Sequence, residues 1–453
     1  MMMRSQCHFR LTTILPNYHV AARIRSGYDL LINASAACGF YLDMMDGATN
    51  ETIGRMYQDP VFESTGTRIG TNQGYVYYFG NPENATKMNS NSNWYMFLDG
   101  GNLIMLNSFI VSGTGTFEKF TGGMIQETIV PDEVVYAAEM TLIERNDEPA
   151  VTDLSDDNIV TNFLITSVGG YYFPITSGDS QQIGEKFQNP MLDSDNNVIG
   201  VNQGFGYNFP NDTYIFDLGY TGAELLNTNR IFQFDNGERI FAINQVVVFG
   251  SGPYQKYEGS TFLEDIISAD PDYVANISLV IDAADTAQDD ATVASSDAVL
   301  RITNENGFYE AMFDSKTGNQ IGIRFQNPVF HLSTGARIGT NQGYGFLFPP
   351  NDYTLNIQSN RHFYLNEGSL VIYNEVVIGA TGIYKRYTGG IVTETVESLD
   401  PYYNATILLM EPSNMGGDES PAEGSTNSGG NYRHSIVEWC TTIIIINIII
   451  NRH

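Results

Sequence analysis

The heptapeptide IGTNQGY at residues 69 to 75 returns as IGVNQGF at 199 to 205 and again as IGTNQGY at 338 to 344. Neighbouring copies lie about 130 to 140 residues apart, a spacing of domain size that is far above the period of solenoid repeats. The chain is therefore expected to contain one kind of domain three times.

Three further sequence blocks accompany the heptapeptide, in the same order in every copy. They are GFY, GYY and GFY (39–41, 170–172, 307–309), YQDPVF, FQNPML and FQNPVF (57–62, 187–192, 325–330), and GTFEKFTG, GPYQKYEG and GIYKRYTG (115–122, 252–259, 382–389). These blocks define three units at residues 30–145, 161–283 and 298–411. An N-terminal segment (1–29) and a tail (412–453) lie outside the units.

Composition agrees with several small β domains. The length of 453 residues fits about three domains. Aromatic residues make up 12% and charged residues 16% of the chain, which also contains 44 glycines; this profile is typical of many short strands and turns. With 22 basic and 52 acidic residues, the formal net charge is −30. Such a charge repels nucleic acid, so no nucleic-acid partner is expected.

Neither end of the chain predicts a membrane span. The Ile-rich stretch at 441–450 is shorter than the roughly 20 apolar residues that a spanning helix needs. The segment before it, 412–431, is rich in Gly, Ser, Asp and Glu, and this composition predicts a disordered tail.

Six Asn-x-Ser/Thr sequons favour a secreted glycoprotein, outside the cell or in the secretory pathway. A chain rich in Asn, Ser and Thr also forms sequons by chance, and residues 1–40 contain no continuous apolar stretch of the kind found in signal peptides. Both interpretations stay open. The predicted glycosylation sites are Asn33, Asn50, Asn84, Asn211, Asn276 and Asn404.

Runs rich in aromatic and β-branched residues predict the strands of each unit. In the first unit these runs are 72–79, 93–99, 102–113, 122–130 and 134–144. The last run resembles a helix by itself, but its counterparts at 273–282 and 402–411 are typical of strands. About seven or eight antiparallel strands per unit are best accommodated by closure into a barrel, because closure removes unpaired sheet edges. The expected fold is three tandem antiparallel β-barrels.

These motifs resemble two related barrel families. The segment IGTNQG is similar to the V-G-R-A-Q-G segment of dirigent proteins, GFY resembles the opening of their first strand, and VSGTGTFEKFTGG (111–123) is similar to a glycine-rich segment that they share with allene oxide cyclases. The resemblance covers all three units. It implies eight-stranded barrels with an apolar interior, and a family habit of forming homotrimers.

The sequence contains no pattern for metal or cofactor chemistry. The six histidines show no metal-ligand spacing, and no phosphate-binding or dinucleotide motif is present. The three cysteines (Cys7, Cys38 and Cys440) form no metal or disulfide framework. No metal and no cofactor are therefore expected.

The resemblance implies an acidic catalytic residue just after the F-Y of the first strand. Asp43 in the first unit and Glu310 in the third lie near this position, whereas the second unit has Phe173 and Pro174 there. Asp43 and Glu310 are the predicted catalytic residues, directed into a barrel or at its mouth. The arginine of V-G-R-A-Q-G is missing from all three units.

Repeated amides and tyrosines are the candidate ligand-binding residues. In each heptapeptide an Asn and a Gln are neighbours, so one of the two faces the barrel interior. The Gln can orient a ligand or can hold a bend or a bulge by hydrogen bonds to the backbone, and the tyrosines can contact a ligand or fill the core. The predicted ligand-binding residues are Tyr41, Gln73, Tyr172, Gln203, Tyr309 and Gln342.

Two functions stay open. The first is a cofactor-free barrel that binds a small apolar or phenolic molecule and, if it is an enzyme, acts as an isomerase or cyclase or by dirigent-type stereocontrol. The second is a non-catalytic secreted protein whose acidic barrels form a scaffold for a matrix, a polysaccharide or a cation. The joining segments 144–160 and 282–298 are long enough, at up to about 55 Å, for the barrels to pack as an intrachain pseudo-trimer.

Overall fold

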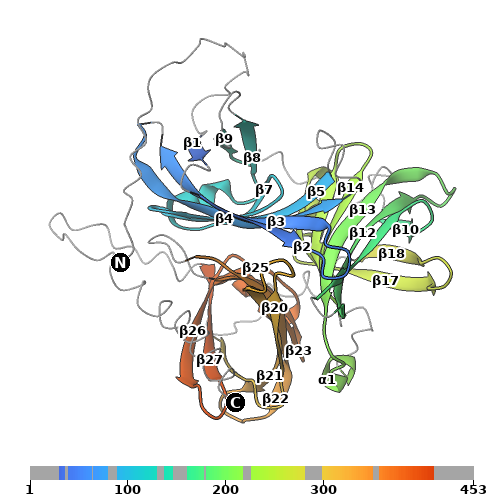
Figure 1. Cartoon of the computed structure of the whole chain (residues 1–453). Coiled ribbons are helices and arrows are strands. Elements are labelled where there is room, and N and C mark those ends of the chain that lie inside the picture. The colour runs from blue at the N-terminus through green and yellow to red at the C-terminus, as the bar shows by residue number, and fades with distance from the viewer. Residues whose placement is uncertain are drawn as a thin grey trace, which may run out of the picture.

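A computed structural model describes residues 30–35, 39–63, 65–79, 89–129, 137–145, 161–177, 180–217, 226–280, 298–349 and 357–412. The predicted fold is confirmed, because these residues form three closed antiparallel β-barrels in tandem, each with eight strands around its wall. Figure 1 shows barrel 1 in blue to teal, barrel 2 in green and yellow, and barrel 3 in orange and red. The N-terminal segment, the two joining segments (except their outermost residues) and the C-terminal tail lie outside the described residues.

Equivalent strands follow one another in the same order in the three barrels. Barrel 1 contains β1 (Leu30–Ser35), β2 (Phe40–Met45), β3 (Thr52–Glu63), β4 (Arg68–Phe79), β5 (Asn89–Leu98), β6 (Gly101–Leu106), β7 (Phe109–Gly113), η2 (Gly115–Phe120), β8 (Met124–Ile129) and β9 (Ala137–Ile143). Barrel 2 contains β10 (Asn162–Thr166), β11 (Tyr171–Thr176), β12 (Gln182–Leu192), β13 (Val198–Asn208), α1 (Thr213–Asp217), β14 (Leu226–Phe234), β15 (Arg239–Ile243), β16 (Val246–Gly250), η4 (Gly252–Tyr257), β17 (Thr261–Ser268) and β18 (Val274–Val280). Barrel 3 contains β19 (Ala298–Thr303), β20 (Phe308–Phe313), β21 (Gln320–His331), β22 (Arg337–Leu347), β23 (Ile357–Leu365), β24 (Gly368–Tyr373), β25 (Val376–Ala380), η7 (Gly382–Tyr387), β26 (Ile391–Ser398) and β27 (Asn404–Met410).

Each barrel closes because one long strand pairs, along a single edge, with two shorter strands; in barrel 1 the long strand is β3. In barrel 1, β1 pairs with β9 and with the C-terminal end of β3, while β2 pairs with the rest of β3. β1 and β2 therefore share one place in the wall. The resemblance assigned the F-Y residues to the first strand, but they open β2, the second strand of the unit.

Two sequence blocks differ from the prediction, because one forms a hairpin in place of a single strand and the other forms a short 3-10 helix. The predicted strand at 102–113 is the hairpin β6–β7, because Asn107 adopts a positive φ of 52° that turns the chain. Asn244 and Asn374 turn the equivalent hairpins, with φ of 52° and 50°. The GTFEKFTG block and its copies form the short 3-10 helices η2, η4 and η7.

The glycines of the heptapeptide make room for an aromatic ring inside each barrel. A Cβ atom on Gly74 would lie 2.7 Å from the hydroxyl of Tyr57, and one on Gly204 would lie 2.7 Å from the ring of Phe187. Gly343 has the same relation to Phe325. The first glycine of each copy, as at Gly70, instead lets a backbone carbonyl of the next strand approach closely. Much of the repeated sequence therefore serves the fold.

Each barrel has its own apolar interior, and the outer faces of the barrels meet in shared clusters. One cluster brings together Tyr75 and Tyr77 of barrel 1, Phe205 and Tyr207 of barrel 2, and Phe346 of barrel 3, among others. A second cluster joins β5, β6 and β7 to β14, β15 and β16 of barrel 2 and to β24 and β25 of barrel 3. The heptapeptide strands are thus buried on both faces.

Equivalent ring pairs connect the barrels in a closed cycle. Ring centroids lie 6.5 Å apart between barrels 1 and 2, 6.3 Å apart between barrels 2 and 3, and 6.4 Å apart between barrels 3 and 1. The pairs are Phe79–Tyr171, Phe209–Phe308 and Phe348–Phe40. Each barrel therefore presents the same two surfaces, one to the barrel before it and one to the barrel after it.

A polar network lies where the three barrels meet. Asn93, Asn229 and Asn360 occupy equivalent positions on β5, β14 and β23. The amides of Asn93 and Asn229 donate to the Tyr373 hydroxyl over 2.6 and 3.1 Å, and Asn360 donates to the Asn229 carbonyl oxygen over 3.0 Å. The hydroxyls of Tyr75 and Tyr344 lie 3.1 Å apart in the same network.

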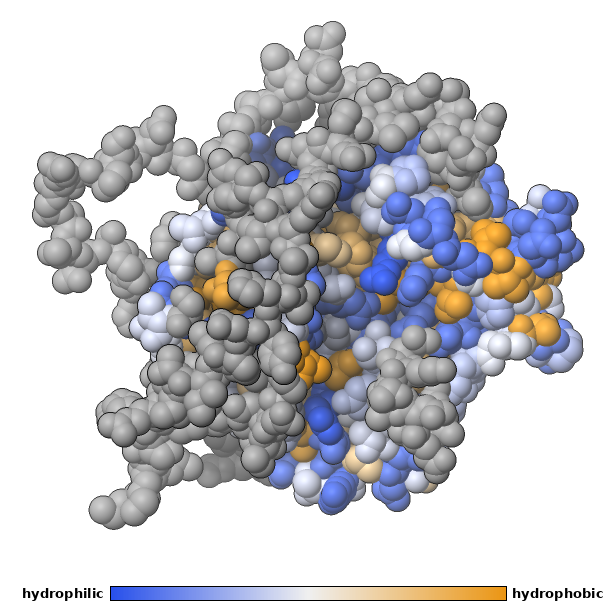
Figure 2. Space-filling view, turned by 90° about the horizontal axis from the view of Figure 1, so that it is seen from above, coloured by the Kyte–Doolittle hydropathy of each residue, from blue (hydrophilic) through white to orange (hydrophobic). Residues whose placement is uncertain are grey.

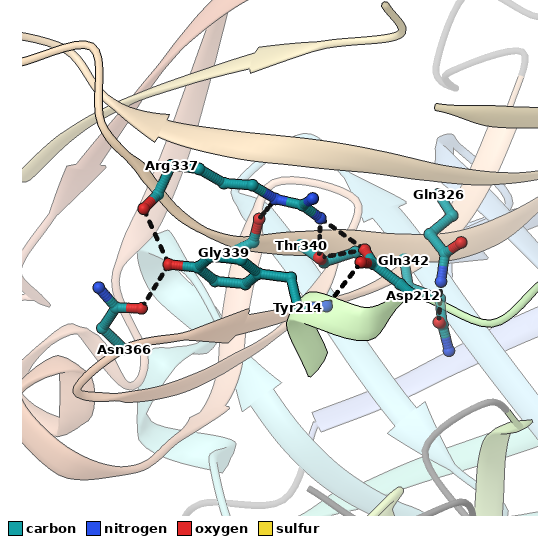
Figure 3. A network of polar contacts seen from close by, with 8 residues as sticks. All are labelled: Asp212, Tyr214, Gln326, Arg337, Gly339, Thr340, Gln342 and Asn366. Carbon is teal, nitrogen blue, oxygen red and sulfur yellow. Dashed lines mark hydrogen bonds and ion pairs between the residues drawn. The ribbon is translucent and has the colours of Figure 1, made fainter. Parts of the chain in front are cut away.

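A further contact joins barrel 2 to barrel 3 through the short helix α1 (Figure 3). The carboxylate of Asp212 accepts hydrogen bonds from Arg337 and Thr340, both over 2.6 Å. The Tyr214 hydroxyl donates to Asn366 over 2.8 Å, and the Arg337 guanidinium lies 4.5 Å from the Tyr214 ring centroid.

On the face seen in Figure 2, hydrophilic side chains surround scattered apolar groups. No helix among the described residues is long and apolar enough to cross a membrane.

We predict that Phe346→Ala destabilises the protein by about 3 to 5 kcal/mol, because the Phe346 ring is buried and packs 4.6 Å from the Tyr75 ring across the contact between barrels. The shift of the urea unfolding midpoint measures the effect. Phe313→Ala on β20 is the control, since Phe313 is an exposed phenylalanine of the same barrel and should change the midpoint little. Equal effects of the two substitutions would contradict a stabilising contact between the barrels.

Candidate functional site

The two predicted catalytic carboxylates do not occupy equivalent positions. β2 and β20 align through Phe40 and Phe308, which pair with Gln58 and Gln326, so Asp43 lies one residue further along its strand than Glu310. Because side chains alternate across a strand, the two carboxylates lie on opposite faces of the wall.

Both of these carboxylates form ion pairs. Asp43 is exposed and accepts a hydrogen bond from Arg55 Nε over 2.7 Å. Glu310 lies 2.6 Å from a guanidinium nitrogen of Arg324, which also donates to the backbone carbonyls of Ile183 and Asn208 in barrel 2. Glu310 thus belongs to the contact between barrels 2 and 3, whereas Asp43 is exposed on the face of β2 that also carries Tyr41, and its partner Arg55 lies 5.9 Å from the Tyr41 ring centroid.

The predicted glutamines lie on the outer faces of the barrel walls. Gln73 and Gln342 each accept a hydrogen bond over 3.0 Å, from Gln58 and from Gln326 respectively, on the neighbouring strand. Gln203 pairs across strands with Ile231, a residue of the second shared cluster. The hydrogen bonds of Gln73 and Gln342 join side chains of neighbouring strands, which differs from the expected alternative of bonds to the backbone at a bend.

The asparagine beside each glutamine faces the interior. Asn72 pairs across strands with Met96, Asn202 with Phe232, and Asn341 with Phe363, and these apolar partners belong to the three interior cores. Asn72, Asn202 and Asn341 are buried, with exposed fractions of 1%, 0% and 1%. The Oδ1 atom of each has no hydrogen-bond partner, nor do the Nδ2 atoms of Asn202 and Asn341. Such atoms are uncommon in protein interiors, where buried polar groups are nearly always hydrogen-bonded.

In barrel 1 a buried carboxyl group stands beside this asparagine. Asp59 on β3 pairs across strands with Asn72 and is 2% exposed. The hydroxyl of Tyr41, a predicted ligand-binding residue on β2, donates to Asp59 Oδ1 over 2.7 Å. Asn189 and Asn327 occupy the position of Asp59 in barrels 2 and 3. The carboxyl group is therefore particular to barrel 1.

Burial raises the pKa of Asp59 to about 6, because the apolar surroundings disfavour the charged form. The charge of Glu127 raises this pKa further, whereas the hydrogen bond from Tyr41 lowers it. A carboxyl group with such a pKa can donate or accept a proton near neutral pH.

Aromatic rings complete this part of the barrel 1 wall. Trp94 on β5 packs against the interior core, and its ring centroid lies 6.2 Å from that of Tyr57. The indole Nε1 has no hydrogen-bond partner. We call Tyr41, Tyr57, Asp59, Asn72 and Trp94 the Asp59 site.

Barrels 2 and 3 hold an ion pair in the same region. Arg230 and Arg361 occupy the position of Trp94. Arg230 lies 2.8 Å from Glu264, and Arg361 lies 2.8 Å from Glu394. The hydroxyls of Tyr273 and Tyr403 donate to these glutamates.

The other two predicted tyrosines lie at the same edge of their barrels as Tyr41. Tyr172 is exposed and donates to Glu185 over 3.0 Å, and Gln182 donates to its hydroxyl over 3.1 Å. Tyr309 pairs across strands with Phe325, as Tyr41 does with Tyr57. In both of these barrels an asparagine occupies the position of Asp59.

The described sequons face outward or lie in turns. Asn276 and Asn404 belong to outer strand faces beside the buried Ala275 and Ala405, and Asn33 lies between the buried Ile32 and Ala34. Asn50 and Asn211 are exposed in turns. Asn84 and the three cysteines lie outside the described residues. Secretion and glycosylation stay predictions.

No group of three or more His, Cys, Asp or Glu residues in the described part of the chain is placed to hold a metal ion. Comparison with known proteins adds no relative: no protein-family model, no curated protein and no solved structure matches the chain.

Two signals in the repeats point to the Asp59 site. The QDP triplet of the first unit stands against QNP in the other two, so its aspartate is an exception within a repeated block. Trp94 likewise stands against two arginines. Differences between copies thus mark the positions at which the interior of barrel 1 departs from the other two.

We predict that Asp59→Asn removes a pH dependence of stability. Since the pKa of Asp59 is raised from 3.8 to about 6 by folding, the folded state binds more protons between these values. The free energy of unfolding of the natural protein should therefore fall as the pH rises through this window.

The variant should lose this component and be more stable at pH 7, by on the order of 3 kcal/mol. Urea titrations at pH 4, 5, 6 and 7 measure the difference, with Asp43→Asn as the exposed control. Parallel pH profiles for the natural protein and Asp59→Asn would contradict the raised pKa.

Proposed function

We propose that the chain is a small-molecule-binding protein whose ligand site is the interior of barrel 1, at the Asp59 site. The observation that carries this proposal is the buried Asn72, whose Oδ1 atom has no partner and which stands beside the buried carboxyl group of Asp59. A bound polar group would satisfy these atoms, while the apolar interior would hold the rest of the ligand.

The chemistry that this site supports needs no cofactor. Asp59 can exchange a proton with a bound molecule near neutral pH, and the Tyr41 hydroxyl orients its carboxyl group. The Asn72 carbonyl oxygen and the Trp94 indole can fix the polar end of the ligand, because one accepts and the other donates a hydrogen bond. A ligand held in one conformation beside a proton donor can react stereoselectively.

We further propose that the chain is related to the dirigent and allene oxide cyclase barrels. The order of the motifs supports this relation, as do three eight-stranded barrels with apolar interiors. On this proposal the activity, if the protein is an enzyme, is of the isomerase or cyclase kind or is dirigent-type stereocontrol, and it resides in barrel 1.

A scaffold is the second candidate function, and one observation favours it for barrels 2 and 3. Their inner walls carry the ion pairs Arg230–Glu264 and Arg361–Glu394, whose charges are satisfied within the protein. Such pairs need no ligand. The two candidate functions are distinguished by one property: the ligand-binding protein takes up a small molecule in barrel 1, and the secreted acidic scaffold does not.

We predict that phenolic or fatty-acid ligands change the fluorescence of Trp94. The chain contains two tryptophans, and Trp439 lies in the tail, so Trp439→Phe leaves Trp94 as the only indole. Titration of this variant with 4-ethylphenol and with linoleic acid should give a saturable change for at least one of them. Asn72→Ala should weaken binding about tenfold, because it removes a buried hydrogen-bonding group worth about 1 to 1.5 kcal/mol.

Asn202→Ala is the matched control, since it makes the same change in barrel 2 and should leave the Trp94 titration unchanged. A complete lack of saturable binding in fluorescence and calorimetry would reject the proposal and favour the scaffold.

We also propose that the three barrels form a lasting intrachain pseudo-trimer, in place of the homotrimer of the related families. The closed cycle of ring pairs supports this, as do two cations that reach the preceding barrel: Lys186 donates to the Tyr78 carbonyl over 2.9 Å, and Arg324 donates to the Asn208 carbonyl. Met56 occupies the equivalent position in barrel 1.

Small-angle scattering of the full chain tests this arrangement. A compact particle of this length is expected to have a radius of gyration of roughly 22 to 23 Å, somewhat increased by the tails. An elongated distance distribution with several maxima would indicate separate barrels on a string and contradict the pseudo-trimer.

A further inference from the structure

The three barrels provide an internal comparison for the Asp59 site. In barrel 2 the Arg230 guanidinium lies 2.8 Å from Glu264, and its central carbon lies 5.5 and 5.6 Å from the ring centroids of Phe187 and Phe262. In barrel 3 Arg361 pairs with Glu394 in the same way. In both barrels the protein itself supplies an organic cation paired with a carboxylate, and in barrel 2 this cation also lies against two aromatic rings.

Barrel 1 has equivalent residues around this position but no arginine at it, and its carboxylate residue, Glu127, is exposed where Glu264 and Glu394 are largely buried. Glu127 is equivalent to Glu264 and Glu394, and Tyr57 is equivalent to Phe187. The arginine position is taken by Trp94, an aromatic residue without charge. A second carboxyl group, Asp59, is present where the other barrels have asparagine.

The donors of this wall include the Trp94 indole N–H and the Arg55 guanidinium, whose central carbon lies 5.9 Å from the Tyr41 ring centroid, and its other polar groups include several acceptors. Asp59 and Glu127 carry carboxyl groups, and the Asn72 Oδ1 atom, in a residue that is 1% exposed, has no hydrogen-bond partner. The faces of Tyr57 and Trp94 carry the negative potential of aromatic rings. Carboxylates, a carbonyl oxygen and ring faces all favour a protonated amine, which has several donors and a positive charge.

From this comparison we infer that barrel 1 prefers a cationic ligand, a protonated amine carried on an apolar or phenolic body. The inference rests on the proposed function and names its ligand class. The amine takes the place that Arg230 and Arg361 occupy in the other barrels, and the apolar body extends toward the interior core. The net charge of −30 also raises the concentration of cations near the protein.

Three probes of similar shape and different charge test the ligand class: tyramine, 4-ethylphenol and 3-(4-hydroxyphenyl)propionate. They are titrated at pH 7 and physiological salt into the full chain with Trp439→Phe, by Trp94 fluorescence and calorimetry. Tyramine should bind at least about tenfold more tightly than 4-ethylphenol, and the propionate most weakly. Asp59→Asn and Glu127→Gln should each reduce the preference for tyramine.

Trp94→Arg is the decisive variant, followed by calorimetry. It gives barrel 1 the arginine of barrels 2 and 3, which should pair with Glu127 and abolish tyramine binding. The net charge changes by only one unit, so nonspecific attraction of a cation would persist in this variant. If this variant does not fold, the two carboxylate variants decide the question.

The outcomes separate the two proposals. If 4-ethylphenol binds as tightly as tyramine, or if tyramine binding survives Asp59→Asn and Glu127→Gln unchanged, the cationic preference is wrong while the ligand site in barrel 1 stands. If none of these probes, and neither ligand of the earlier titration, binds to barrel 1, the proposed function fails with it.

Discussion

The alternation of side chains across a closed sheet is the constraint on which the rest of this structure depends. In the heptapeptide strands β4, β13 and β22, one face lines a barrel and the other lies against the neighbouring barrels. Asn72 therefore points to the interior, while Gln73 and Tyr75 belong to the outer face. A strand buried on both faces has little room for other side chains, which agrees with the five residues that are identical in all three heptapeptides.

The contacts between barrels follow from the same alternation. Because each barrel presents the same two outer surfaces, the ring pairs repeat from barrel 1 to 2, from 2 to 3 and from 3 back to 1. The asparagine and tyrosine network at the meeting point is buried in apolar surroundings, where an unmatched polar group is costly. Such a network favours one arrangement of the three outer faces over shifted alternatives, as buried polar residues do in coiled coils. The contacts between barrels are thus made by residues of the outer faces. Residues of the interiors can therefore differ from one barrel to the next.

Divergence of the interiors separates barrel 1 from the others. Two substitutions relative to the shared pattern, Asp59 for asparagine and Trp94 for arginine, replace an internally satisfied ion pair with a carboxyl group of raised pKa beside aromatic rings. Arg230 and Glu264 stabilise each other's charged forms, whereas burial acts against the charge of Asp59. The same fold therefore encloses two interiors with a buried ion pair and one interior with a buried carboxyl group beside aromatic rings.

The sequence by itself determined the three-fold repetition, the β class and the closure into barrels, because periodic patterns and repeated motifs are local properties of the chain. It also showed that either the asparagine or the glutamine of each heptapeptide must face inward. Only the tertiary structure decided which one, since this depends on the register of β4 with β3 and β5. Register likewise placed Asp43 and Glu310 on opposite faces and in ion pairs, and brought Tyr41 to Asp59 across 18 residues of sequence. Burial and partners are set by residues distant in the chain, and for that reason the carboxyl group of interest was visible in the sequence only as a difference between copies.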